Sequence, residues 1–249
     1  MGVVLREVKT GEADRVLTVL TEKLGVISAI AKNSLRMKSK LLTATELFCY
    51  AEFTLYEGKN MYQVDSASAQ KVFYGLRKDI DAMALGMYCA ELASCVVPDG
   101  QNAGEPLRLL LNTFYCISEK KYPLLQIKAA YELRMISEAG FMPDLVACVG
   151  CGKYEGGSFL LNEEEGVLLC ADCCAKRGYT PNLAPGVLAA MRHIIFSEPK
   201  KIFSFSLSPA AAAQLCRATG SYVLAKIDRK LKSLDFLYET LFSETEKNG

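Results

Sequence analysis

Two matched cysteine pairs, Cys148-Val-Gly-Cys151 and Cys170-Ala-Asp-Cys173, decide how the middle of this chain folds. A Cys-x2-Cys turn holds two sulfur atoms about one metal-ligand distance apart, and two such turns supply the corners of a tetrahedron around zinc. The 18 residues between the pairs (152–169) fall within the range of zinc ribbons. The sequence therefore predicts one structural Zn²⁺ per chain, bound by Cys148, Cys151, Cys170 and Cys173.

Other interpretations of these cysteines stay open, namely a disulfide pair, a redox-active Cys-x-x-Cys, or buried thiols that bind nothing. Cys174 directly follows Cys173 and is a candidate substitute ligand, but its spacing breaks the symmetry of the pairs, so we predict a bystander. Four protein ligands leave no open coordination position, and the metal is expected to stabilise the fold without catalysing a reaction. Residues 159–161 and 167–169 are predicted to form a hairpin between the pairs.

The N-terminal part of the chain is rich in strand patterns and turn residues. Strands are predicted at residues 3–9, 15–21, 26–31, 46–56 and from 61 to 64. Five short strands do not make a stable open sheet with one wet face, whereas a closed barrel has no free edges. We therefore predict a five-stranded oligonucleotide/oligosaccharide-binding (OB) fold over residues 1–80.

From residue 66 the apolar spacing becomes helical. The pattern predicts a long helix or helix pair up to residue 97, followed by helices at 105–117, 123–139, 186–196, 209–230 and 233–242, with a polar tail at 243–249 that frays. The fold class is thus multidomain α+β. An N-terminal OB-fold barrel (1–80) is followed by an all-α helical domain (81–249), into which the four-cysteine zinc module (144–180) is inserted.

Positive charge is concentrated in the predicted barrel. The whole chain has a net charge of +1, but residues 1–78 contain 12 Lys and Arg against 8 Asp and Glu. No acidic residue occurs between Glu22 and Glu46, a stretch that includes a flexible basic loop at 32–40. We predict that these cations contact DNA phosphates: Arg15, Lys23, Lys32, Arg36, Lys38 and Lys40. The alternative is a loop that is merely solvated.

No catalytic constellation is visible. The single histidine, His193, lies in a predicted helix, and the chain lacks a phosphate-binding loop, a dinucleotide-binding loop and a zinc-protease motif. We therefore predict no catalytic residue and a binding protein that is not an enzyme. We predict a protein of the reducing cytoplasm. The ten cysteines show no paired framework, no signal peptide is recognised, and no apolar run is long enough to cross a bilayer.

The order of these parts resembles that of the bacterial recombination mediator family RecO. The residues that carry the resemblance are Gly11 to Thr18, Thr21 to Gly25, Ala31-Lys32 with Arg36 and Ser39, Glu132-Leu133-Arg134, Gly140 to Leu145 leading into Cys148 and Cys151, and Lys232-Ser233-Leu234. Where the family tends to have Ala-Lys-Gly followed by arginines, this chain has Asn33 and Leu35, so the loop is expected to be less densely charged.

The resemblance implies an OB-fold followed by a helical domain with a zinc finger. It also implies a non-enzymatic mediator of DNA repair in the cytoplasm, at the nucleoid. Such a protein binds single- and double-stranded DNA, anneals complementary strands, works with RecR, contacts the tail of single-stranded DNA-binding protein and helps to load RecA.

Two functions from other classes compete with this interpretation. The first is a zinc-stabilised adaptor whose helices bind other proteins while the barrel contacts no nucleic acid. The second is a thiol oxidoreductase that uses Cys148 and Cys151, which would require a lowered thiol pKa and a pair free of metal.

Overall fold

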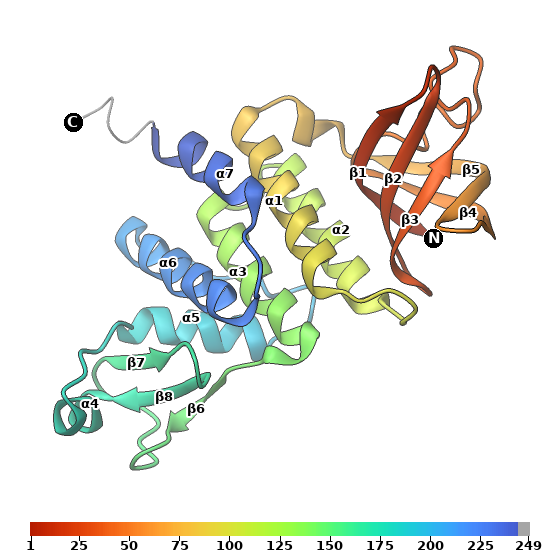
Figure 1. The fold of residues 1–249 in the computed structure, drawn as a ribbon. Helices are drawn as coiled ribbons and strands as arrows, with labels where there is room; N and C mark the ends of the chain where they lie inside the picture. The colour runs from red at the N-terminus through yellow and green to blue at the C-terminus, as the bar shows by residue number, and fades with distance from the viewer. Residues whose placement is uncertain (244–249) are drawn as a thin grey trace. The chain divides into compact units, whose positions relative to one another are not determined.

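The computed structural model describes residues 1–243, and the side chains of residues 1–240. The chain divides into two compact units, which are described separately (Figure 1). Unit 1 combines residues 1–119 with the C-terminal segment from Leu231, and unit 2 comprises Lys120–Lys230. The domain boundary near residue 80 remains a prediction. Of the tail predicted to fray (243–249), Ser243 is the last residue of a helix, and residues 244–249 lie outside the described part.

Five strands of unit 1 form a closed barrel, as predicted. They are β1 (Gly2–Thr10), β2 (Asp14–Thr21), β3 (Gly25–Ala31), β4 (Cys49–Glu57) and β5 (Tyr62–Val72). Their order around the barrel is β1-β2-β3-β5-β4, in which only the short β3–β5 pairing is parallel. Alternate side chains of β2 and β3 are buried because successive residues of a strand point to opposite faces. The barrel prediction is therefore confirmed.

The last two strands differ from their predicted bounds. β4 begins at Cys49 because Phe48 has a positive φ of 62° and its N–H donates to the carbonyl of Val4. β5 continues to Val72, where the sequence predicts a helix from residue 66 onward. Pairing along the whole of β4, from Cys49 with Val72 to Glu57 with Tyr62, outweighs the local helical pattern.

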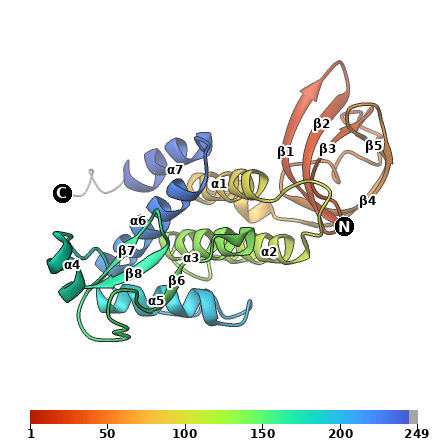
Figure 2. The same ribbon diagram turned by 60° about the horizontal axis from the view of Figure 1, so that its bottom comes forward.

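Three α-helices complete the described part of unit 1. They are α1 (Ile80–Val96), α2 (Gly104–Ser118) and α7 (Lys232–Ser243), with a short 3₁₀ turn, η1 (Tyr74–Arg77), before α1. α1 packs against both α2 and α7, and Figure 2 shows α1 beside α7. The Glu91 carboxylate on α1 accepts the backbone N–H groups of Lys232 (3.1 Å) and Ser233 (2.7 Å), and also the Ser233 hydroxyl. Glu91 thereby satisfies N–H groups that the first turn of α7 leaves unpaired.

The barrel of unit 1 is docked on α1 and α2. The β2–β3 turn meets the α1–α2 connection, where Gly100 N–H donates to the Leu24 carbonyl (2.9 Å) and Ala103 N–H to the Glu22 carbonyl (2.8 Å). On another side, the Phe114 ring of α2 lies edge-on to Phe48 and Phe73, with ring centroids 5.0 and 5.5 Å apart. The barrel is therefore part of a larger core.

Unit 2 consists of a three-stranded sheet and four α-helices. They are α3 (Leu124–Ile136), a π-helical turn η2 (Ser137–Phe141), β6 (Asp144–Cys148), β7 (Phe159–Asn162), β8 (Val167–Cys170), α4 (Ala171–Arg177), α5 (Pro185–Phe196) and α6 (Pro209–Lys226). The sheet has the order β6-β8-β7, and β7 with β8 forms the predicted hairpin. Between α3 and α6, the buried Lys128–Glu132 ion pair (2.6 Å) is joined by the Thr219 hydroxyl, which donates to Glu132 (2.7 Å).

None of the helices within residues 1–243 is long and apolar enough to cross a membrane.

Gly25 makes the docking of the barrel testable. Its φ is +63°, and a Cβ atom there would lie 1.9 Å from the Pro98 carbonyl oxygen, closer than any non-bonded contact allows. Gly11 has a similar φ of +56° with nothing within 4 Å, so it isolates the backbone effect. We expect Gly11→Ala to lower the free energy of unfolding by about 1 kcal/mol, and Gly25→Ala by roughly 3 kcal/mol. Denaturant unfolding followed by tyrosine fluorescence measures both, and equal losses would contradict the docking.

Candidate metal centre and nucleic-acid interface

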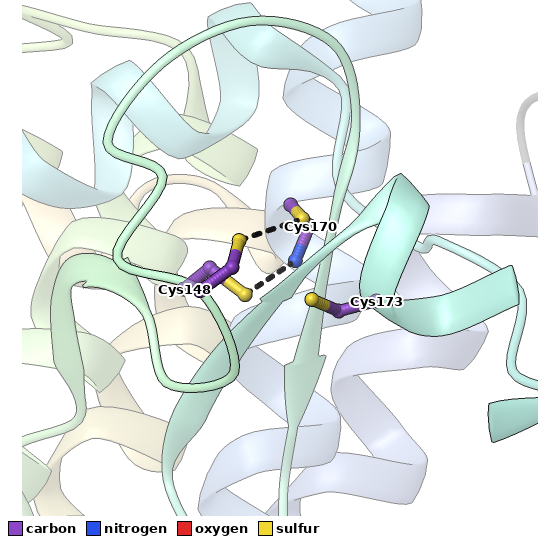
Figure 3. A group of neighbouring side chains, drawn as sticks. Cys148, Cys170 and Cys173 are labelled. Atoms are coloured by element: carbon purple, nitrogen blue, oxygen red, sulfur yellow. Dashed lines mark hydrogen bonds between the residues drawn. The ribbon is translucent and has the colours of Figure 1, made fainter. Parts of the chain in front are cut away.

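Four cysteine sulfurs come together at one end of the sheet in unit 2. Cys148 ends β6, Cys170 ends β8, Cys151 lies in the turn after β6, and Cys173 lies in α4. All four Sγ atoms lie within 4.8 Å of one another, and those of Cys151 and Cys170 are 3.6 Å apart. Sulfurs bound tetrahedrally to one zinc ion are about 3.8 Å apart, given bonds of about 2.3 Å. Figure 3 shows three of these side chains converging, and the cluster could hold a metal ion.

The backbone around the first pair follows from its glycines. Gly152 has a φ of +72°, which closes the turn so that its N–H reaches the Cys148 carbonyl (2.8 Å). A Cβ atom at Gly150 would lie 3.0 Å from the Cys173 sulfur, so glycine keeps that side of the cluster open. Cys174 is not one of the four clustered cysteines, and its buried thiol donates to the Leu169 carbonyl (3.6 Å).

The protein environment shifts the thiol pKa values of Cys148 and Cys173 in opposite directions. Burial raises the pKa of Cys148, but backbone N–H groups, first that of Cys170 at 3.2 Å, stabilise its thiolate and lower the pKa to about 6. Hydrogen bonds to the sulfurs of Cys151 and Cys148, together with burial, raise the pKa of Cys173 to about 12. A divalent cation among the four sulfurs would supply the positive charge that four thiolates together require.

Arg192 of α5 supports the first cysteine turn, and the sequence gives no local signal of this role. Its guanidinium donates to the carbonyls of Leu145 (2.7 Å), Val146 (2.9 Å) and Tyr154 (2.8 Å), on both sides of the turn. It also stacks on the Tyr154 ring at 4.2 Å. The cluster is therefore tied to the helices of unit 2 through backbone carbonyls about 40 residues away in the sequence.

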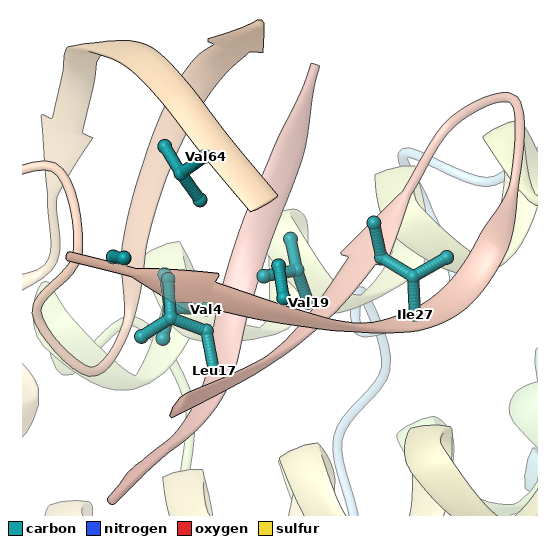
Figure 4. Packing of buried hydrophobic residues seen from close by; sticks show 7 residues of the cluster. Val4, Leu17, Val19, Ile27 and Val64 are labelled. Atoms are coloured by element: carbon teal, nitrogen blue, oxygen red, sulfur yellow. The ribbon is translucent and has the colours of Figure 1, made fainter. Parts of the chain in front are cut away.

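The interior of the barrel in unit 1 is filled by apolar side chains. Val4, Leu17, Val19, Ile27 and Val64 meet there and are almost completely buried (Figure 4). A filled interior leaves no room for a ligand, so any nucleic acid must contact the outer surface and the connecting loops.

Arg15 lies beneath the basic loop instead of projecting to solvent. Only 6% of the residue is exposed, and its guanidinium contacts Glu7 (2.9 Å), the Leu42 carbonyl (2.8 Å) and the Thr45 hydroxyl (2.7 Å). A guanidinium with these partners has a structural role. The structure therefore does not present Arg15 for the phosphate contact that the sequence suggests.

The β3–β4 connection, residues 32–48, contains the basic loop predicted at 32–40 and is held to the barrel by hydrogen bonds on both sides of that loop. Asn33 N–H donates to the Asp14 carboxylate (2.7 Å), and Leu35 N–H donates to the Ala13 carbonyl (2.9 Å). Ser34 and Thr45 are fully buried, so both ends of the connection are fixed on the barrel.

The structure brings four of the predicted cations together on this connection. They are Lys32, Arg36, Lys38 and Lys40, all exposed, and none forms an ion pair with a carboxylate among the side chains of residues 1–240. Lys23 is also exposed, but it lies in the β2–β3 turn, away from these four cations. The β2–β3 register pairs Arg15 with Ala31 at one end and Thr21 with Gly25 at the other, so Lys23 and Lys32 are roughly 25 Å apart.

The four-cysteine cluster leads to a metal-binding prediction. Freshly reduced protein should contain one zinc ion per chain, and Cys148→Ser should lower the zinc content and the melting temperature of unit 2, because zinc binding stabilises the folded module. Cys174→Ala is the matched control and should keep its zinc. Metal analysis with calorimetry measures both effects, and an equal loss of zinc from the two variants would refute this ligand set.

Burial of Arg15 leads to a separate prediction. Arg15→Ala leaves the half-buried Glu7 carboxylate without its partner and removes the hydrogen bonds to Leu42 and Thr45, so we expect the free energy of unfolding to fall by about 2 kcal/mol. Lys32→Ala removes an exposed cation of the same region and should change stability by less than about 0.5 kcal/mol. Denaturant unfolding compares them, and equal stabilities would mean that Arg15 does not anchor the loop.

Two models of known protein families match the chain, one over its N-terminal part and one over the remainder up to residue 235. Residues 1–73 match the model of the Recombination protein O N terminal domain, and residues 77–235 match that of the Recombination protein O C terminal domain. The chain is 32% identical to the DNA repair protein RecO of Acetivibrio thermocellus, over 95% of this chain and 94% of that protein. It is 30% identical to the protein of the same name from Symbiobacterium thermophilum, over 95% and 94% of the two chains. With both halves matched, the resemblance inferred from the sequence is confirmed, and the chain belongs to the RecO family.

Proposed function

We propose that this protein is a non-enzymatic recombination mediator in DNA repair. It binds single- and double-stranded DNA, anneals complementary strands and, together with RecR, helps to load RecA onto strands coated with single-stranded DNA-binding protein. The cellular site is the cytoplasm, at the nucleoid. Family membership and the names of the relatives, DNA repair proteins RecO, support the repair role, and the partners follow from the family resemblance alone.

The observation that carries the DNA-binding proposal is the anchored basic connection of the barrel. Two DNA strands repel each other through their phosphates, so an annealing protein must screen both strands and leave the base edges free to pair. Lys32, Arg36, Lys38 and Lys40 offer four positive charges on one anchored segment, without a carboxylate partner among the described side chains. Long cationic side chains at such positions hold phosphates without reading the sequence. Lys23, at the far end of the β2–β3 hairpin, would contact a different part of a bound strand.

In this proposal the barrel is the DNA-binding domain (1–80) and the remainder (81–249) is a helical domain with the metal module at 144–180. Zn²⁺ would be held by Cys148, Cys151, Cys170 and Cys173, and would supply structural stability, since four protein ligands leave no open coordination position. The module is acidic: Asp and Glu number six between residues 144 and 180, against three Lys and Arg. Its charge disfavours phosphate contact, which supports the barrel as the DNA-binding part of the chain.

The test is the salt dependence of single-strand binding. Replacing Lys32, Arg36, Lys38 and Lys40 together by alanine should flatten the log-log slope by about 3, from roughly 0.7 per phosphate contact, and should slow strand annealing. The matched control replaces four exposed cations of unit 2, namely Lys176, Arg177, Lys200 and Lys201, and should leave the slope unchanged.

Fluorescence anisotropy across a salt series, with folding checked by circular dichroism, gives both slopes. If the loop variant keeps the parent slope and annealing rate, the loop is only solvated. If the parent protein does not bind oligonucleotides at all, the zinc-stabilised adaptor is the better description of the chain.

A further inference from the structure

Met37, at the tip of the basic connection, is the most exposed large apolar side chain among residues 1–240, with 92% of its surface accessible. It occupies the second position of a turn from Arg36 to Ser39, closed by a hydrogen bond from Ser39 N–H to the Arg36 carbonyl (2.8 Å). The exposed cations Arg36 and Lys38 flank it on either side. The turn thus projects one apolar side chain between two positive charges.

Two other apolar residues of the connection, Leu35 and Leu41, are partly buried. Leu41 packs against the barrel core, and Leu35 is half-buried while its N–H is bound to the Ala13 carbonyl. Arg15 holds the far side of the connection through the Leu42 carbonyl and Thr45. Because Leu35 on one side and the segment from Leu41 to Thr45 on the other are bound to the barrel, the short segment between them presents Met37 outward.

We propose that Met37 is an apolar wedge that inserts between neighbouring bases of a bound DNA strand. Methionine is long, unbranched and polarisable, and it is among the side chains that proteins insert between base steps. Arg36 and Lys38 would hold the phosphates of the step that Met37 opens. This inference rests on the proposed DNA binding and deepens it: the same loop binds the backbone and unstacks the bases, which exposes their edges for pairing.

The test uses a single DNA strand that carries 2-aminopurine between two adenines. The fluorescence of 2-aminopurine rises when this base is unstacked from its neighbours. The parent protein should raise this fluorescence. Met37→Ala should abolish most of the rise and weaken binding by about fivefold, with an unchanged salt slope, because no phosphate contact is lost. Met37→Leu should retain most of the rise. Met142→Ala, which alters another exposed methionine (60% accessible) in unit 2, should behave as the parent.

The Met37→Lys variant distinguishes base insertion by Met37 from a purely electrostatic contribution of this position. Met37→Lys should steepen the salt slope by about 0.7 and still lose the fluorescence rise. Two results would overturn the wedge while leaving DNA binding by the loop intact: no fluorescence rise with the parent, or an undiminished rise and affinity with Met37→Ala. An unchanged salt slope in the variant lacking the four loop cations would instead count against the proposed function itself.

Discussion

A buried guanidinium needs partners for its charge and for its N–H groups. In this protein, that requirement fixes the β3–β4 connection, which carries the exposed cations, onto the barrel. Arg15 satisfies it with Glu7 on β1 and with Leu42 and Thr45 on the β3–β4 connection. The Thr45 hydroxyl in turn donates to the Leu41 carbonyl, so the connection is held by a short relay of hydrogen bonds. Without Arg15, the connection would lose its anchor on the Leu42–Thr45 side, and only the hydrogen bonds of Asn33 and Leu35 would position its exposed cations.

Several residues that carry the family resemblance turn out to build the fold. Thr21 accepts the Leu24 N–H and donates to the Gly25 carbonyl, which shapes the turn that docks on α1 and α2. Arg134 donates to the Ile195 carbonyl, and Ser233 is bound by Glu91. The hydrogen bonds of Arg134 and Ser233 connect segments that are far apart in the sequence, whereas Thr21 acts within its own turn. Their shared physical role is to position helices and turns, whereas the candidate ligand-binding groups are those of the cysteine cluster and of the basic connection.

The sequence predicts what depends on local spacing and fails where long-range contacts decide. The four cysteines and the hairpin between them follow from short-range motifs, and the barrel follows from alternating strands. The length of β5 does not, because its pairing with β4 overrides a local helical pattern. Burial of Arg15 depends on Thr45, 30 residues away, and the separation of Lys23 from Lys32 depends on the β2–β3 register. No local pattern encodes these relations.

The central claim is that the β3–β4 connection of the barrel, and not the acidic metal module, touches DNA. Photo-crosslinking of the whole protein to a single strand containing 4-thiothymidine, followed by peptide mapping, tests it most directly. The account predicts crosslinks concentrated in residues 32–40, which diminish as salt is raised because the contacts are with phosphates. Crosslinks concentrated in residues 144–180, with none in residues 32–40, would contradict it.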